Sequence, residues 1–264
     1  MKESPLAWLD YFQDNHKKAL LRDLEPDVRL LEELINLVSQ CVDEINIALP
    51  DSDLQQLYES KDEKLLCATV SGMLLYEAVE RLHAARSLLL LGYQGRMLAC
   101  LRDMIESLYY SDVCMKNPQE ARRWLDNGYI SKDTATEVHQ VVERNRKGQM
   151  WNLLSGAGVH PRLATRLSST RYKTPSLGDF RGDPHAVDTK NARRERDYPN
   201  TRLNIWVAMT LTHDFVLYLH ETYSRVCHEN AEISSTMEKL EKEYHARAKE
   251  LSDSIPTRVG DQIP

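Results

Sequence analysis

The sequence predicts an all-α protein: a single helical bundle around a long antiparallel helical hairpin, followed by a coiled-coil-like C-terminal helix. Apolar residues recur at steps of three and four along residues 62–116, which is the pattern of amphipathic helices. Gly and Pro are scarce, at ten each in 264 residues, and Leu, Ala, Glu, Lys and Arg outnumber Val and Ile. This composition favours helices over sheets.

The hairpin is predicted from two apolar stripes that are separated by a short turn at residues 92–95. The first stripe, which ends at Gly92, comprises Leu65, Leu66, Val70, Met73, Leu74, Ala78, Leu82, Ala85, Leu88 and Leu89. The second comprises Met97, Leu98, Leu101, Met104, Ile105, Leu108 and Tyr109. We expect Asp62 or a neighbour to cap the first helix. So short a connection makes the two helices antiparallel neighbours.

Further helices are predicted on both sides of the hairpin. They are expected at residues 4–22, from Pro26 to before Pro50, at 51–58, at 119–126 between Asn117-Pro118 and Asn127-Gly128, at 131–146, and again from residue 200.

The last predicted helix, residues 231–251, carries a short coiled-coil stripe with Arg247 in its seam. The stripe comprises Ile233, Met237, Leu240, Tyr244 and Leu251, and should dock on the domain or on a partner subunit. We therefore expect a bundle domain at residues 1–230, and a charged helix and tail at 231–264.

Composition and motifs exclude several classes of protein. No apolar run approaches the roughly 20 residues of a membrane span, and no signal-peptide region opens the chain, so we expect a cytoplasmic protein. The five cysteines never form a CxxC pair, which predicts reduced core residues instead of disulfides or structural zinc. The common nucleotide-binding, zinc-protease and esterase motifs do not occur, and we expect no cofactor.

Arg102, Glu106 and His160 are the candidate catalytic residues. Arg102 and Glu106 lie one helical turn apart, and form either a structural ion pair or part of a pocket in which Arg102 binds an anion or phosphate. His160 precedes Pro161, which favours extended backbone at the end of an element. Its imidazole is either an accessible acid or base, or a packing residue against a helix carbonyl or Trp151.

Residues 168–200 lose the helical periodicity and form a long predicted loop. Ten Lys or Arg and five Asp or Glu fall at residues 162–202, a local balance of +5. The rest of the chain carries −11, because the net charge is −6. Cations with occasional aromatics suit RNA, so the candidate RNA-binding residues are Arg171, Lys173, Arg181, Arg193, Arg194 and Arg196. The alternative is a solvated loop, or one that complements an acidic face of the fold.

Glu80-x-x-His83, with Glu77 close by, has the spacing of a ligand pair in di-iron carboxylate bundles. Those bundles need a second such pair, and no other histidine follows a glutamate by three, although His213, His220 and Glu221 on a later helix could contribute. A polar cluster inside the bundle fits this pattern better, so no metal ligand is predicted.

Several short motifs together suggest a family. They are Gly92-Tyr93 before a helix, Leu101-Arg102-x-x-x-Glu106 with Tyr109 and Tyr110, Asn117-Pro118-x-x-Ala121-x-x-Trp124, and Leu154-Ser155 with His160-Pro161. This combination, over residues 62–165, resembles a group of uncharacterised prokaryotic helical proteins similar to abortive-infection and HEPN-type domains. The resemblance implies an all-helical bundle, often dimeric, in defence or toxin systems, and a metal-independent endoribonuclease where active.

The chain departs from the HEPN ribonucleases in one respect. Those enzymes rely on an arginine followed by four to six residues and a histidine, and none of the nine histidines has that spacing. Arg181-x-x-x-His185 comes nearest, and it lies in the proline-bearing loop. The family's catalytic residues therefore cannot be transferred to this chain.

We expect a HEPN-like homodimer of a prokaryotic defence or stress system, with Arg102, Glu106 and His160 around a polar pocket and residues 170–200 near RNA. In a ribonuclease, His160 would act as acid or base and Arg102 would stabilise the phosphorane charge. Two alternatives remain: a non-catalytic helical dimer that binds a protein partner through residues 231–251, and a metal-binding bundle at Glu80, His83 and Glu106.

Overall fold

The structure is a computed structural model of the chain, and it describes residues 5–48, 62–144, 198–223 and 230–254. These residues form eight α-helices and no β-strand. The helices are α1 (Pro5–Asp23), α2 (Glu25–Ala48), α4 (Glu63–Leu90), α5 (Gln94–Lys116), α6 (Pro118–Asn127), α7 (Lys132–Arg144), α11 (Tyr198–Thr222) and α13 (Ala231–Ser254). The all-α prediction is confirmed. The predicted helix at residues 51–58 lies outside the described residues.

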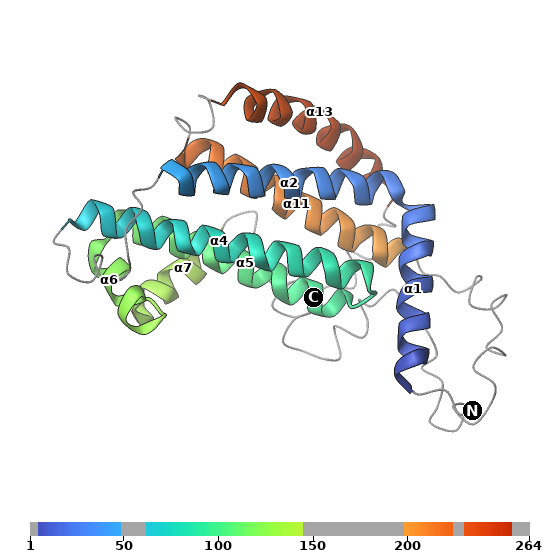
Figure 1. Cartoon of the computed structure of the whole chain (residues 1–264), viewed down its shortest axis with the longest axis horizontal. Coiled ribbons are helices and arrows are strands. Elements are labelled where there is room, and N and C mark those ends of the chain that lie inside the picture. Colours follow the sequence, from blue (N-terminus) through green and yellow to red (C-terminus); the bar gives the residue numbers. More distant parts are fainter. Residues whose placement is uncertain (1–4, 49–61, 145–197, 224–229, 255–264) are drawn as a thin grey trace.

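The helices lie in layers (Figure 1). The α4–α5 hairpin forms one side, α2 and α11 form the middle, and α13 covers the far side of α2 and α11. α1 crosses one end of the hairpin, while α6 and α7 lie at the other end. In addition, α2 packs on α4 of the hairpin.

Helix ends follow local signals that the sequence carries. The Asp62 carboxylate caps α4 by accepting hydrogen bonds from the backbone amides of Lys64 and Leu65 at 3.0 and 3.1 Å. The Asn117 side chain caps α6 in the same way, and Gly128 ends that helix in the left-handed region at φ 74°. These three predicted boundaries are confirmed.

The α4 helix is buried on more than one side, because it packs against α5, α2, α6 and α1. Buried positions therefore go beyond the predicted stripe and include Cys67, Leu75 and Val79. Met73 was predicted to belong to the core, but it is 37% exposed. One apolar stripe does not describe the buried surface of α4, because neighbouring helices cover more than one side of it.

Two buried serines join the hairpin near its open end. Ser71 on α4 and Ser111 on α5 are fully buried, and their Oγ atoms are 2.6 Å apart. Each hydroxyl also lies within hydrogen-bond distance of the other residue's carbonyl oxygen, at 3.1 and 3.2 Å. The Tyr223 hydroxyl lies 3.0 Å from Ser71 Oγ, so the end of α11 is attached to the same polar junction. Each of these buried polar groups has a partner, as burial requires.

Gly92 closes the hairpin at a position that a side chain would strain. Its φ is +84°, and a Cβ there would lie 3.2 Å from Cδ2 of the His16 ring on α1. Gly128 also has a positive φ, of +74°, but a Cβ there would meet nothing within 4 Å. A comparison of substitutions at the two glycines therefore separates the free-energy cost of left-handed backbone from the cost of the contact with His16.

We expect Gly92→Ala to lower the free energy of unfolding by about 2 kcal/mol, because left-handed backbone costs roughly 1–2 kcal/mol in a residue with a Cβ and His16 must also move. Gly128→Ala, the matched control, should cost about 1 kcal/mol. Urea denaturation of both variants measures the difference. Equal losses would show that the His16 contact adds nothing.

The C-terminal helix α13 packs onto the bundle. Ile233, Leu240 and Tyr244 are buried in the same core cluster as α2 and α11, and Met237 packs against that cluster. Asn230 caps the helix by accepting from the amides of Glu232 and Ile233 at 3.1 and 3.2 Å. The apolar stripe that could have bound a partner is thus used within the chain.

Arg247 occupies the seam of α13 because a buried acid faces it. Asp27 on α2 is fully buried, and it accepts from both Nε and Nη2 of Arg247, the latter at 3.1 Å. These hydrogen bonds raise the pKa of Arg247, so its charge is secure. The arginine in this apolar seam therefore forms a bidentate ion pair that joins α13 to α2.

None of the described helices is both long and apolar enough to cross a membrane.

Cys41, Cys67 and Cys114 are buried free thiols, and Cys100 is partly buried. Burial raises the pKa of Cys114 to about 12, with a contribution from Glu120, so this thiol stays protonated. The predicted core position is confirmed for Cys41, Cys67 and Cys114, whereas Cys100 only packs against the core. Cys227 lies outside the described residues.

Candidate functional site

Arg102 and Glu106 form the predicted ion pair on α5. Nη2 and Nε of Arg102 donate to Oε1 of Glu106 at 2.9 and 3.2 Å. The side chains are 27% and 23% exposed, so the pair lies at the edge of the hairpin and not inside it. Both of these hydrogen bonds go to one carboxylate oxygen. Burial and the Glu106 charge raise the pKa of the neighbouring Tyr110 hydroxyl, which therefore stays protonated at neutral pH.

The other predicted site residues lie in a part of the chain that the structure does not describe. His160 and the candidate RNA-binding residues Arg171, Lys173, Arg181, Arg193, Arg194 and Arg196 all fall within residues 145–197. The described helices therefore provide only Arg102 and Glu106 of the predicted set. The polar pocket that should bring His160 to them stays a prediction.

The Glu80 and His83 positions do not form a metal site with Glu106. Both are exposed on α4. His83 Nε2 lies 3.0 Å from the Ser39 hydroxyl, while Glu106 is engaged with Arg102 on α5. Among the described residues, no group of possible metal ligands includes any of the three. The di-iron spacing on α4 belongs to a polar surface.

A cavity of about 310 Å³ lies between α5 and α11. Its apolar and aromatic lining residues are Met104, Ile105, Leu108, Tyr109, Leu211 and Tyr218, and its polar ones are Asp112, Lys116, Asp214, Glu221 and Thr222. Lys116 donates to Asp112 at 2.8 Å, so its charge is already compensated. Three carboxylates and one paired lysine disfavour phosphate. Arg102 and Glu106 are not among the lining residues, so this is not the predicted anion pocket.

Tyr218 lines this cavity, and its hydroxyl is buried. Burial raises the pKa of that hydroxyl well above its usual value. Ser111 and Thr222 lie near the Tyr218 hydroxyl and partly offset the rise in its pKa. Neither residue has the geometry of a hydrogen bond to this hydroxyl.

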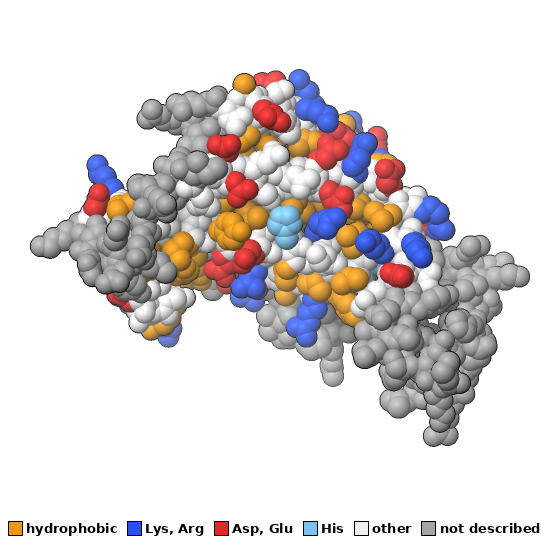
Figure 2. Space-filling view, viewed as in Figure 1, with side chains coloured by type: hydrophobic (Ala, Val, Ile, Leu, Met, Phe, Trp, Pro, Cys, Tyr) orange, Lys and Arg blue, Asp and Glu red, His pale blue; other side chains and the backbone are white. Residues whose placement is uncertain are grey.

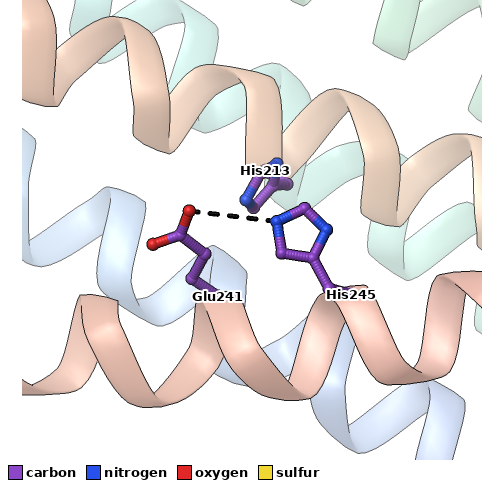
Figure 3. A group of neighbouring side chains, drawn as sticks. All are labelled: His213, Glu241 and His245. Atoms are coloured by element: carbon purple, nitrogen blue, oxygen red, sulfur yellow. Dashed lines mark ion pairs between the residues drawn. The ribbon is translucent and has the colours of Figure 1, made fainter.

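A second cluster of polar residues forms where α13 docks on α11. His213 from α11 and Glu241 and His245 from α13 place one possible ligand atom each within 4.8 Å of one another. Figure 3 shows the His213 ring over the gap between the other two side chains. Nε2 of His245 lies 3.8 Å from Oε1 of Glu241.

His213 is held in place by its surroundings. It is only 7% exposed, and its ring stacks on Tyr244 with centroids 4.1 Å apart and an interplanar angle of 12°. Tyr244 is fixed in turn by a hydrogen bond from its hydroxyl to Thr210 Oγ1 at 3.1 Å. Burial lowers the pKa of His213, and His245 lowers it further, so the ring is neutral near pH 7.

The sequence places only two of the three residues of this cluster near each other. Glu241 and His245 are one turn apart on a charged helix, a spacing that is common on surfaces. His213 lies 28 positions earlier than Glu241 on another helix, and only the docking of α13 brings them together. No local pattern predicts such a pair of helices.

Comparison of the chain with protein-family models, with curated proteins and with solved structures finds no match.

Proposed function

We propose that this protein contacts RNA through its basic segment, residues 162–202, with the helical bundle as a scaffold. The observation that carries the proposal is the separation of charge along the chain: +5 in this segment against −11 in the rest. A basic segment on an acidic protein is suited to phosphate, because it attracts the polyanion while the scaffold does not. The proposal includes the HEPN-like character and the role in prokaryotic defence or stress that the sequence resemblance implies.

Two arginines of the described bundle support this assignment, because each is already paired with an acid. Arg86 pairs with Glu32 and Arg247 with Asp27. On the face that Figure 2 shows, Lys and Arg side chains are interspersed with Asp and Glu side chains. A polyanion would find compensated charges on this face, so the basic segment is the better candidate.

The proposed chemistry, if RNA is cut, is proton transfer by His160 with charge stabilisation by Arg102. The imidazole would take the proton of the attacking hydroxyl, or give one to the leaving oxygen. Arg102 uses two donors on a single oxygen of Glu106, and a phosphate would compete with that carboxylate for the guanidinium. Glu106 would then position Arg102 for the phosphate.

Binding of a short single-stranded RNA to the full chain tests the proposal. We expect the Arg193→Ala, Arg194→Ala, Arg196→Ala triple variant to bind at least tenfold more weakly than wild type, because three phosphate contacts are lost. The control is the Lys132→Ala, Lys242→Ala, Lys249→Ala variant, which removes the same charge from three exposed lysines on the bundle. Equal weakening in both variants would show a nonspecific charge effect and would remove the segment from the proposal.

Cleavage is read from the same samples. Wild type should cut the RNA without added metal, and His160→Ala should lower the rate by about two orders of magnitude or more, as the loss of a general acid or base does. Cleavage at equal rates by wild type and His160→Ala would remove the catalytic role of this residue. RNA binding without any cleavage would leave a binding protein and reject the nuclease.

A further inference from the structure

The contact between α11 and α13 leaves one buried imidazole nitrogen without a partner. Nε2 of His213 is buried and accepts or donates no hydrogen bond among the described residues. A buried polar atom without a partner costs free energy, and native proteins usually satisfy it. The stacking on Tyr244 supplies van der Waals contact but no hydrogen bond, so it does not remove this cost.

The two side chains that complete the cluster are ligands of the same kind. Glu241 offers a carboxylate oxygen and His245 an imidazole nitrogen, and both are exposed on adjacent turns of α13. Two imidazoles and one carboxylate form a ligand set of catalytic zinc sites and of other first-row metal sites. Such a set leaves a coordination position for water. Carboxylate and imidazole groups on the solvent side also give an ion a route of entry.

The geometry requires only a small adjustment. The ligand atoms lie within 4.8 Å of one another, whereas bonds of about 2.1 Å to a tetrahedral ion place them nearer to 3.4 Å apart. Glu241 and His245 are 53% and 65% exposed, so their side chains can rotate inward without displacing core residues. His213, the fixed member, is buried and its ring is neutral, so it can bind an ion without first losing a proton.

We propose that His213, Glu241 and His245 bind one divalent transition-metal ion of the Zn²⁺ class, at a site that joins α11 to α13. The bound ion satisfies the unpartnered nitrogen of His213 and cross-links two helices that are separate in the chain. The site uses none of the residues of the basic segment, so its test is separate from the test of RNA contact.

Titration of the chelator-treated full chain with Zn²⁺, and with Co²⁺ as a spectroscopic probe, tests this site. We expect one equivalent to bind with a Kd in the micromolar range or below, visible absorption bands from bound Co²⁺, and a higher Tm with Zn²⁺. His245→Ala and Glu241→Gln should each weaken binding by at least about tenfold, because each removes one of three ligands. Both residues are exposed, so neither change should unfold the protein.

The matched control is His83→Ala, which removes an exposed histidine from α4, outside the cluster. It should bind Zn²⁺ as wild type does. Absence of binding up to about 1 mM Zn²⁺, or equal affinity in wild type and His245→Ala, would overturn the proposal. Weakening of the same size in His83→Ala and His245→Ala would assign the signal to scattered surface histidines and would also overturn it.

Discussion

Phe215→Ala is expected to lower the free energy of unfolding by about 4 kcal/mol, the largest effect of any single change that we predict. Phe215 is fully buried on α11 and is among the largest buried side chains of the core. The α11 helix contacts α2, α5 and α13, so a cavity at Phe215 is enclosed by neighbouring helices. The expected cost therefore combines lost burial with an unfilled cavity.

Leu217→Ala on the same helix is the control. Leu217 is 38% exposed, and its truncation should cost no more than about 1 kcal/mol. Urea denaturation followed by circular dichroism at 222 nm measures both variants against wild type. A loss below about 1.5 kcal/mol for Phe215→Ala would mean that the core around α11 is loosely packed.

Arg247→Ala should be the second most damaging change, with a loss of about 3 kcal/mol. It leaves Asp27, which is fully buried, without the guanidinium that neutralises it. The estimate takes the lower end of the range for a broken buried pair, because Arg247 itself is 33% exposed. The same loss should loosen α13 and speed hydrogen exchange along that helix.

Arg29→Ala provides a control at the same interface. Arg29 on α2 pairs with Glu243 on α13 at 3.4 Å, but its side chain is 58% exposed, so its loss should cost less than about 1 kcal/mol. A double-mutant cycle of Asp27→Ala and Arg247→Ala isolates the coupling between the buried pair. Additive losses in that cycle would show that the two charges do not stabilise each other.

Local signals predicted most of the fold. The Asp62 cap, the Asn117-Pro118 start and the Gly128 end of α6 all act within four residues, and the structure confirms each one. The turn at Gly92 also depends only on neighbouring residues, since its length determines that the two helices are antiparallel. Helix starts without such a signal are less accurate: α11 begins at Tyr198, two residues before the predicted start.

Packing between distant helices could not be predicted in this way. Met73 matches the apolar spacing of α4, but it faces solvent because the neighbours of α4 leave that angle uncovered. Arg247 looks like a break in an apolar seam, and only the position of Asp27, 220 residues earlier, explains it. Both results depend on which helix lies beside which, and a single sequence does not contain that information.

The same distinction between local signals and packing of distant helices applies to the candidate sites. Arg102 and Glu106 were predicted as a pair, because residues one turn apart on a helix are neighbours in every helix. His213, Glu241 and His245 were not predicted as a cluster, because it exists only once α13 docks on α11. Sites built within one helix can be read from sequence, whereas sites built between helices require the fold.

The salt dependence of RNA binding tests the proposed function most directly. For single strands, the logarithm of the binding constant falls with the logarithm of salt concentration by about 0.7 for each phosphate contact. The Arg193→Ala, Arg194→Ala, Arg196→Ala variant should therefore show a slope shallower than wild type by about 2. The Lys132→Ala, Lys242→Ala, Lys249→Ala control should keep the wild-type slope. Identical slopes for all three proteins, or no binding of RNA at low salt, would contradict RNA contact by residues 162–202.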